Sequence, residues 1–303
     1  MKIFIPPIGE NWINDRLAYE FAERTKHEVV SRWMTADLVW SITPSLVRNY
    51  GKPQVLTIAH IVPSKYQDLS EFYNKNTSQE IDKYVTHYTC YSDFTIDFIK
   101  EKNITQKEIT KIPYWINTSL FYPIPNLKDE KYLTIGSFQR DTEGRDLISP
   151  KLEKGPDVFL EVVNAIKDTH QNIRVMLTGH RRQYVITGLE KMGVPYQYHE
   201  FCDFTKLNEL YNMCDYYLVT SRCEGGPQAI LEAAQTKCNI LATNVGVAKD
   251  ILDKECVCYN VNDFVGKIKT RVDKTKENYD NVQHYEMKKI IKYYDEFFES
   301  CLK

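Results

Sequence analysis

The sequence lacks the features that mark membrane-spanning, secreted and nucleic-acid-binding proteins. None of its apolar runs approaches the ~18 residues that a membrane-spanning helix needs. The first ten residues, MKIFIPPIGE, carry one lysine and are broken by Pro6 and Pro7, so they predict a strand rather than a secretory leader. The formal net charge is −2 and no long block of Lys and Arg occurs, which argues against nucleic acid as a partner.

The eight cysteines show no spacing typical of a disulfide framework or a zinc site. There is no C-x-x-C pair. Cys256 and Cys258 form only a C-x-C, without a second pair of ligands, so we expect no metal site. Without a secretory leader, the natural expectation is reduced thiols and a cytoplasmic protein.

What the sequence does contain is a repeated alternation of short apolar strands and helices, interrupted by the proline-rich stretch FYPIPNLKDEKY. Such alternation predicts parallel sheets, and 303 residues suit two domains of about 150 residues each. Before the interruption we expect strands at residues 2–6, 27–30, 36–42, 53–63, 87–92 and 108–117, and helices at 11–25 and 93–104. After it we expect strands at residues 132–138, 173–179, 196–201, 215–221 and 238–244, and helices at 156–168, 182–193, 204–214, 227–237 and 247–253. The last segment, 285–303, predicts an amphipathic helix.

One strand–turn–helix stretch, TSRCEGGPQAILEAAQ, places two glutamates, Glu224 and Glu232, eight positions apart. Gly225 and Gly226 allow the backbone to approach a ligand, and the start of a helix offers free N–H groups. Pro227 fits the first helical position, where its missing N–H costs nothing.

The second glutamate is predicted about two turns into the helix. Glu232 is four positions after Gln228, so its side chain is expected to point back toward the helix start. Together with Glu224 at the strand end, it offers an acceptor-only carboxylate, and two such groups suit a ligand with vicinal hydroxyls.

The longer stretch SRCEGGPQAILEAAQTKCNILATNVG resembles the E-x7-E signature of the retaining GT-B-fold glycosyltransferases of family four. KIPYWINTSLFYP resembles the family's segment before the second domain, and IGSFQR with PKLEKGPDVFLEVV resembles the first strand, loop and helix of that domain. The resemblance covers the second domain well and the first domain loosely.

This resemblance implies the GT-B fold, in which two doubly wound, Rossmann-like domains face a central cleft. We expect an acceptor-side domain at 1–122, a nucleotide-sugar-binding domain at 123–284, and a C-terminal helix at 285–303 that crosses back to the first domain. The helix would use the apolar face formed by Tyr293, Tyr294, Phe297 and Phe298.

The resemblance also implies a reaction and its residues. A retaining, metal-independent enzyme would transfer sugar from a nucleotide-diphosphate sugar, UDP- or GDP-linked, to a glycan, lipid or other acceptor. Glu224 would contact the sugar hydroxyls and Glu232 the ribose. Lys154 and Arg140, with Lys151 as an alternative helper, would neutralise the charge on the leaving diphosphate.

Further positions carried over from the family lie at strand ends. His60 would hydrogen-bond the donor sugar or the acceptor, and Gly9 would approach the donor phosphates, with Glu10 and Asn11 near the acceptor. The remaining donor-binding positions are Gly136, Ser137, Gly179, Gly225, Gly226, Pro227 and Gln228, with Arg181 beside Gly179 as a further contact.

Two departures from the family pattern keep other functions open. Ser137 stands where the family commonly has arginine, and the first domain is short for the family. Lys237, which stands where the family has glycine, is a further difference, in a turn. A non-catalytic nucleotide-sugar-binding protein therefore remains an alternative, as does a GT-B-type nucleotide-sugar epimerase, which would need a further set of acid/base groups. A peripheral membrane contact, the donor, the acceptor and the oligomeric state stay open.

Overall fold

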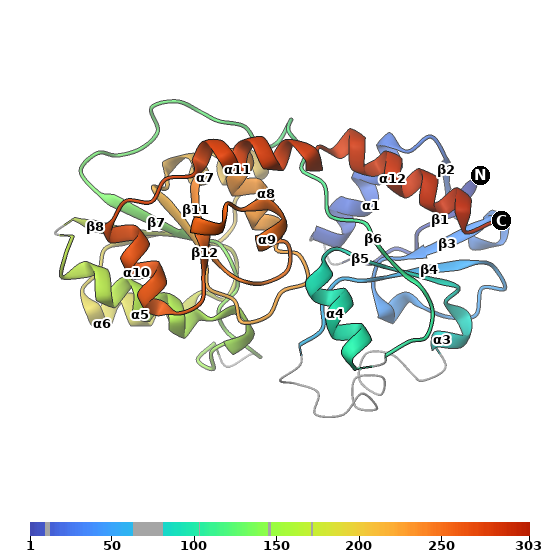
Figure 1. Ribbon diagram of the computed structural model, residues 1–303, viewed down its shortest axis with the longest axis horizontal. Coiled ribbons are helices and arrows are strands. Elements are labelled where there is room, and N and C mark those ends of the chain that lie inside the picture. Colours follow the sequence, from blue (N-terminus) through green and yellow to red (C-terminus); the bar gives the residue numbers. More distant parts are fainter. Residues whose placement is uncertain (10–12, 63–80, 103, 145–146, 171) are drawn as a thin grey trace. The chain divides into compact units, whose positions relative to one another are not determined.

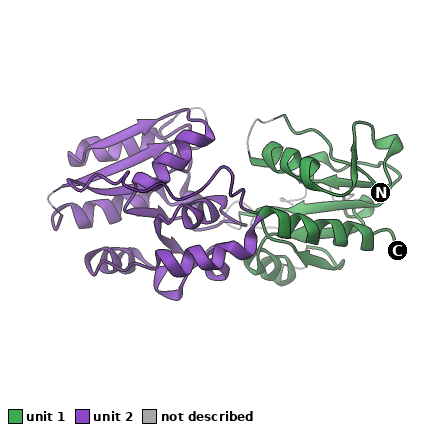
Figure 2. Cartoon of the chain, turned by 90° about the horizontal axis from the view of Figure 1, so that it is seen from above, with its two compact units in different colours: residues 1–115, 287–303 green, residues 116–286 purple. Residues whose placement is uncertain are grey.

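The structure is a computed structural model that describes residues 1–9, 13–62, 81–102, 104–144, 147–170 and 172–303. The chain divides into two units, drawn in different colours in Figure 2. Unit 1 comprises Met1–Trp115 and Met287–Lys303, and unit 2 comprises Ile116–Glu286. Within the described ranges, no helix combines the length and the apolar character required to cross a membrane.

Unit 1 is built on a six-stranded, fully parallel sheet with the strand order β2-β1-β3-β4-β5-β6 (Figure 1). Its strands are β1 Lys2–Phe4, β2 Glu28–Val30, β3 Leu38–Ser41, β4 Gln54–Ile58, β5 His87–Cys90 and β6 Ile109–Lys111. Its helices are α1 Ile13–Arg24, α3 Ile81–Tyr84, α4 Asp93–Glu101 and α12 Met287–Ser300, with 3-10 turns η1 Trp33–Thr35 and η2 Pro44–Leu46. Every residue of β3 and β4 is buried, as expected for central strands covered on both faces.

The start of α4 differs by one residue from the sequence pattern, which favours Asp93 as the N-cap. In the structure Ser92 is the N-cap, and its Oγ accepts a hydrogen bond from the Thr95 N–H at 3.4 Å. Asp93 is the first helical residue, where its negative charge still suits the N-terminal end of the helix.

The C-terminal helix α12 packs on the N-terminal region within unit 1, as predicted. Tyr294 and Phe298 are fully buried, with ring centroids 5.0 Å and 5.3 Å from that of Trp40. Phe21 of α1 lies 5.7 Å from Phe298 by the same measure. The inclusion of Tyr293 in this apolar face was wrong, because its side chain lies on the outer side of the helix and is 55% exposed.

Unit 2 repeats the design with a second parallel sheet in the order β12-β11-β10-β7-β8-β9. Its strands are β7 Leu133–Ser137, β8 Ile173–Thr178, β9 Tyr196–His199, β10 Tyr216–Val219, β11 Asn239–Thr243 and β12 Val257–Cys258. Its helices are α5 Pro156–Lys167, α6 Gln183–Met192, α7 Phe204–Met213, α8 Gln228–Gln235, α9 Ala248–Ile251, α10 Val261–Lys269 and α11 Thr275–Val282. Its 3-10 turns are η4 Leu152–Lys154, η5 Lys254–Cys256 and η6 Gln283–Tyr285.

The two parallel sheets with their helices confirm the predicted α/β class of two Rossmann-like units. In unit 2 the chain order reverses between the neighbouring strands β7 and β10. In open α/β sheets, ligands bind beyond the carboxyl ends of the strands at such a reversal. The loops that follow β7 and β10 are therefore the place to look for a site.

Candidate active site

The loops after β7 and β10 are held together by a close backbone contact. Gly155, which follows η4, has φ +61°, and a Cβ there would lie 1.9 Å from the Thr220 carbonyl oxygen. The Thr220 hydroxyl donates to the Gly155 carbonyl at 2.8 Å. The N–H of Arg222 donates to the Glu153 carbonyl, also at 2.8 Å. Only glycine allows the turn before α5 to dock against the end of β10 in this way.

This docking brings together Lys154 and Glu224, which are 70 positions apart in the chain. Lys154 Nζ lies 2.5 Å from Glu224 Oε1, and the Ser221 hydroxyl donates to the same carboxylate oxygen at 3.0 Å. Glu224 is 8% exposed. A cation and a carboxylate therefore meet at the reversal of the strand order, in a largely desolvated setting where each stabilises the other's charge.

Gln139, in the loop after β7, joins the two sides of this pair. Its Nε2 donates to the Lys154 carbonyl at 2.8 Å, and its Oε1 accepts from the Ser221 hydroxyl at 3.2 Å. No motif in the sequence singles out Gln139. The available signal was its position, as a polar side chain two residues beyond a buried strand at the reversal of strand order.

The predicted positions at the end of β7 lie in different environments. Gly136 is inside the strand, where a Cβ would lie 2.6 Å from Cys214 Sγ, so close packing accounts for this glycine. The Ser137 hydroxyl faces Arg182 and accepts from its guanidinium at 3.1 Å. Arg140 Nε donates to the Thr142 carbonyl at 2.8 Å.

Two positive groups meet in the loops after β7 and β8. The pKa of Arg140 is lowered, first by partial burial and then by the charge of Arg181. The Arg181 guanidinium donates to the Gly144 carbonyl at 2.5 Å. Gly179 and Arg181 both have positive φ, 89° and 59° respectively, so the loop after β8 turns sharply before α6 begins. Two arginines in proximity suit an anionic ligand.

The second glutamate of the motif is also buried. Glu232 is 6% exposed and its Oε2 accepts from the Tyr211 hydroxyl at 3.0 Å. Burial and the Glu232 charge raise the pKa of Tyr211. Helix α8 begins at Gln228 with Pro227 as its N-cap, so Pro227 is one position earlier than predicted. Glu232 consequently lies about one turn into the helix rather than two.

The turn that contains Gly225 and Gly226 is supported from the next strand. Gly246, after β11, has φ +52°, and a Cβ there would lie 2.7 Å from Pro227 Cδ and 3.0 Å from the Gly226 nitrogen. Tight backbone packing behind the turn fixes the approach to α8, where the predicted donor contacts of Gly225, Gly226, Pro227 and Gln228 remain predictions.

Two of the predicted site residues, Gly9 and His60, belong to unit 1. Gly9 follows β1 with φ +72°, and its N–H donates to Asp15 Oδ1 at 3.1 Å. His60 follows β4 and is half-buried. Glu10 and Asn11 lie outside the described residues.

Across the residues that the structure describes, no group of three or more His, Cys, Asp or Glu side chains is placed to hold a metal ion. Cys256 and Cys258 are both buried, and burial raises their pKa values to about 11 and about 12. Both thiols are therefore neutral at ordinary pH.

Part of unit 2 matches a known protein family. Residues 150–289 match the family described as Glycosyl transferases group 1, a range that contains Lys154, Glu224 and Glu232. This match confirms the resemblance drawn from the sequence. No curated protein sequence matches the chain significantly.

Three solved structures share the fold. Anabaena HepE in complex with UDP-glucose is 13% identical, covers 99% of both chains and has a TM-score of 0.76. Sucrose-phosphate synthase from Thermosynechococcus elongatus is 14% identical over 88% of this chain and 73% of its own, with a TM-score of 0.71. S. aureus TarM is 14% identical over 88% of this chain and 55% of its own, with a TM-score of 0.66. These similarities confirm the GT-B fold class.

Proposed function

We propose that the chain, whose residues 150–289 match the family of glycosyl transferases group 1, is a retaining glycosyltransferase that uses a nucleotide-diphosphate sugar. The acceptor in this proposal is a hydroxyl compound of unassigned class, and the transfer proceeds without a metal ion. HepE, whose structure holds UDP-glucose and which covers nearly all of this chain, supports a UDP-linked donor.

The observation that carries the proposal is the contact of 2.5 Å between Lys154 Nζ and Glu224 Oε1 at the reversal of strand order. The two side chains can bind different parts of the same nucleotide-sugar donor. The ammonium neutralises phosphate oxygens, and the carboxylate accepts hydrogen bonds from sugar hydroxyls. A nucleotide sugar presents both kinds of group within a few bonds of the reacting carbon.

In the proposed reaction the bond between the anomeric carbon and the diphosphate oxygen breaks, and its electron pair leaves with the nucleoside diphosphate. The acceptor oxygen bonds to the anomeric carbon, and its proton passes to the oxygen of the leaving diphosphate. Negative charge develops on the diphosphate, so Lys154, assisted by Arg140, stabilises the transition state more than the ground state. Glu224 fixes the sugar through its hydroxyls, and Glu232 accepts from the ribose.

The test is release of free nucleotide from a panel of UDP-, GDP- and ADP-linked sugars, with and without simple acceptors. We expect one donor to be cleaved slowly without an acceptor. Glu224→Ala and Lys154→Ala should each reduce this release by at least about a hundredfold, the scale of losing an electrostatic contact to the transition state.

Matched controls on the same unit are Glu161→Ala and Lys191→Ala, which remove exposed side chains of α5 and α6. Both should retain wild-type release. If a nucleotide sugar binds but is never cleaved, the chain is a binding protein, and if no nucleotide sugar binds, the proposal fails.

A further inference from the structure

We propose that Arg182 is a positioning residue, which holds the Lys154–Glu224 pair in its working geometry without contacting the donor itself. This inference rests on the proposed function. The sequence pattern HRR at residues 180–182 offers three basic side chains at the end of β8, and the structure gives them different environments. His180 is exposed, Arg181 reaches the Gly144 carbonyl, and Arg182 is completely buried.

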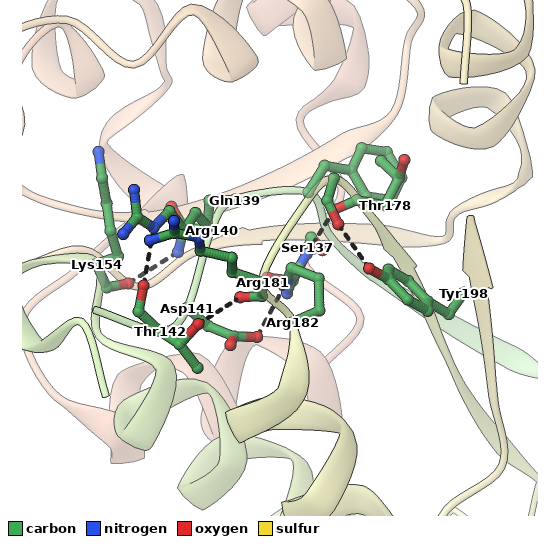
Figure 3. A network of polar contacts seen from close by, with 12 residues as sticks. Ser137, Gln139, Arg140, Asp141, Thr142, Lys154, Thr178, Arg181, Arg182 and Tyr198 are labelled. Atoms are coloured by element: carbon green, nitrogen blue, oxygen red, sulfur yellow. Dashed lines mark hydrogen bonds and ion pairs between the residues drawn. The ribbon is translucent and has the colours of Figure 1, made fainter. Parts of the chain in front are cut away.

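The guanidinium of Arg182 donates from all three of its nitrogens. Nε donates to Asp141 Oδ2 at 2.9 Å. One terminal nitrogen donates to the carbonyls of Ser137 and Thr178, the latter at 2.9 Å, and the other donates to the Ser137 hydroxyl at 3.1 Å. Figure 3 shows these partners converging on the side chain from the ends of β7 and β8 and from the loop after β7. The guanidinium of Arg182 is therefore occupied by hydrogen bonds within the protein and is not available to a ligand.

The carboxylate of Asp141 completes the network. Asp141 is 1% exposed, and burial raises its pKa, while Arg182 and the backbone N–H groups of Val185 and Tyr184 act in the opposite direction. Since an unpaired charge at this depth would be costly, the pair restrains the relative position of the two loops tightly.

The loop after β7 is fixed to the loop after β8 by backbone contacts as well. The N–H groups of Asp141 and Thr142 both donate to the Arg181 carbonyl, at 3.1 Å and 3.2 Å. The Lys151 N–H donates to the Asp141 carbonyl at 2.8 Å. Arg181 adopts the left-handed conformation when it presents that carbonyl, a conformation that is unfavourable for an L-residue other than glycine. Such a position persists where surrounding contacts determine it.

The side chain of Gln139 connects the loop after β7 to Lys154 and Glu224. Gln139 donates to the Lys154 carbonyl and accepts from the Ser221 hydroxyl, which also donates to Glu224. A shift of the loop would therefore move the backbone of Lys154 and loosen the carboxylate of Glu224 together. Small displacements of reacting groups reduce rates strongly, by about a hundredfold for 1 Å.

The simpler alternative is that Arg182, the N-cap of α6, only stabilises the fold, and a matched arginine on the preceding strand β8 separates the two possibilities. Arg174 is 8% exposed, ion-pairs with Asp129 at 3.2 Å and donates to the Thr134 hydroxyl at 3.0 Å. It is the second residue of β8, at the end of the strand opposite to Arg182. Arg174→Met removes a buried guanidinium from the same unit without touching the loops of the site.

The experiment compares Arg182→Met, Arg182→Lys and Arg174→Met at a temperature where all three are folded, with thermal melts to verify this. The first measurement is the steady-state kinetics of donor cleavage. We expect Arg182→Met to lower kcat and kcat/KM together by about tenfold or more relative to Arg174→Met, because the altered contacts act at the reacting centre. Arg182→Lys should recover part of the loss.

The second measurement is hydrogen exchange of the peptides that cover residues 139–155 and 220–226. Arg182→Met should accelerate exchange in both peptides, and Arg174→Met should leave both unchanged. Equal kinetics and equal exchange in the two variants would overturn the proposal. If the wild-type protein cleaves no nucleotide sugar, the proposed function fails, and the exchange data still decide whether Arg182 holds the two loops.

Discussion

At the scale of single residues, the candidate site depends on a glycine as much as on its charged groups. Gly155 has φ +61° and packs directly on the Thr220 carbonyl, which is the contact that places Lys154 beside Glu224. Glu224 and Lys154 carry the chemistry in the proposed function, but they meet only because no side chain lies between η4 and β10. The same residue that shapes the turn therefore builds the ion pair.

Gly155→Ala is expected to damage both stability and turnover. Its methyl group would lie 1.9 Å from the Thr220 oxygen, and the backbone there cannot yield easily. We expect a loss of more than about 3 kcal/mol in the free energy of unfolding. Gly193→Ala is the control, since Gly193 has φ +67° with no atom within 4 Å of the added methyl group. It should cost only about 1 kcal/mol. Equal denaturant midpoints for the two variants would contradict this.

At the scale of elements, the sequence predicted the strands and helices with strong apolar patterns. The six strands of unit 1 and the strands from β7 to β11 all occur where expected, as do the helices from α5 to α9. Helix α10 was missed although it carries such a pattern, with Phe264 and Ile268 buried four positions apart. Two other missed segments, β12 and α11, lack that signal. Strand β12 has two residues, and the buried residues of α11 are Asn278 and Val282, which give no apolar stripe.

Part of the candidate site was equally beyond prediction from the sequence. The sequence offered Glu224, Glu232 and Lys154 as candidates, because they lie in stretches that resemble a family motif and at predicted strand and helix ends. It did not identify Arg182 as a buried residue or Gln139 as a link between loops. A buried arginine and an exposed one read alike in a sequence, and only the packing of the two loops distinguishes them.

The helix α12 offers a prediction at this scale. Phe298 is fully buried against Phe21 and Trp40, whereas Tyr293 on the same helix is 55% exposed. Phe298→Ala should lower the free energy of unfolding of unit 1 by about 3 to 5 kcal/mol, because it leaves a cavity in an aromatic cluster. Tyr293→Ala should stay within about 0.5 kcal/mol of the wild type. Chemical denaturation followed by tryptophan fluorescence measures both, and similar losses would refute the assigned orientation of the helix.

At the scale of the whole molecule, the buried thiols predict how stability depends on alkaline pH. Burial raises the pKa of Cys223 and Cys256 from 9.0 to about 11, and that of Cys238 and Cys258 to about 12. Below pH 9 these four thiols are protonated in both the folded and the unfolded protein, and their contribution to the free energy of unfolding is fully present. Between about pH 9 and pH 12 the unfolded chain binds fewer protons than the folded one, so the free energy of unfolding falls as pH rises.

Guanidinium unfolding under reducing conditions at about pH 8, 9 and 10 measures this slope. Each pKa unit corresponds to about 1.4 kcal/mol per group across its window. Cys223→Ala should make the fall shallower by removing one contributing thiol. A free energy of unfolding that stays level from about pH 8 to pH 10 would show that the thiols are not held protonated by the fold.

The central claim is that Lys154 binds the diphosphate and Glu224 binds the sugar of the same donor. Calorimetric titration with UDP-glucose and with UDP tests this claim most directly. Lys154→Met should weaken both ligands similarly, because both carry the diphosphate. Glu224→Gln should weaken UDP-glucose by about tenfold or more and leave UDP within a factor of about two, since only UDP-glucose carries the sugar hydroxyls. Equal effects of Glu224→Gln on the two ligands, or unchanged binding in Lys154→Met, would contradict the account.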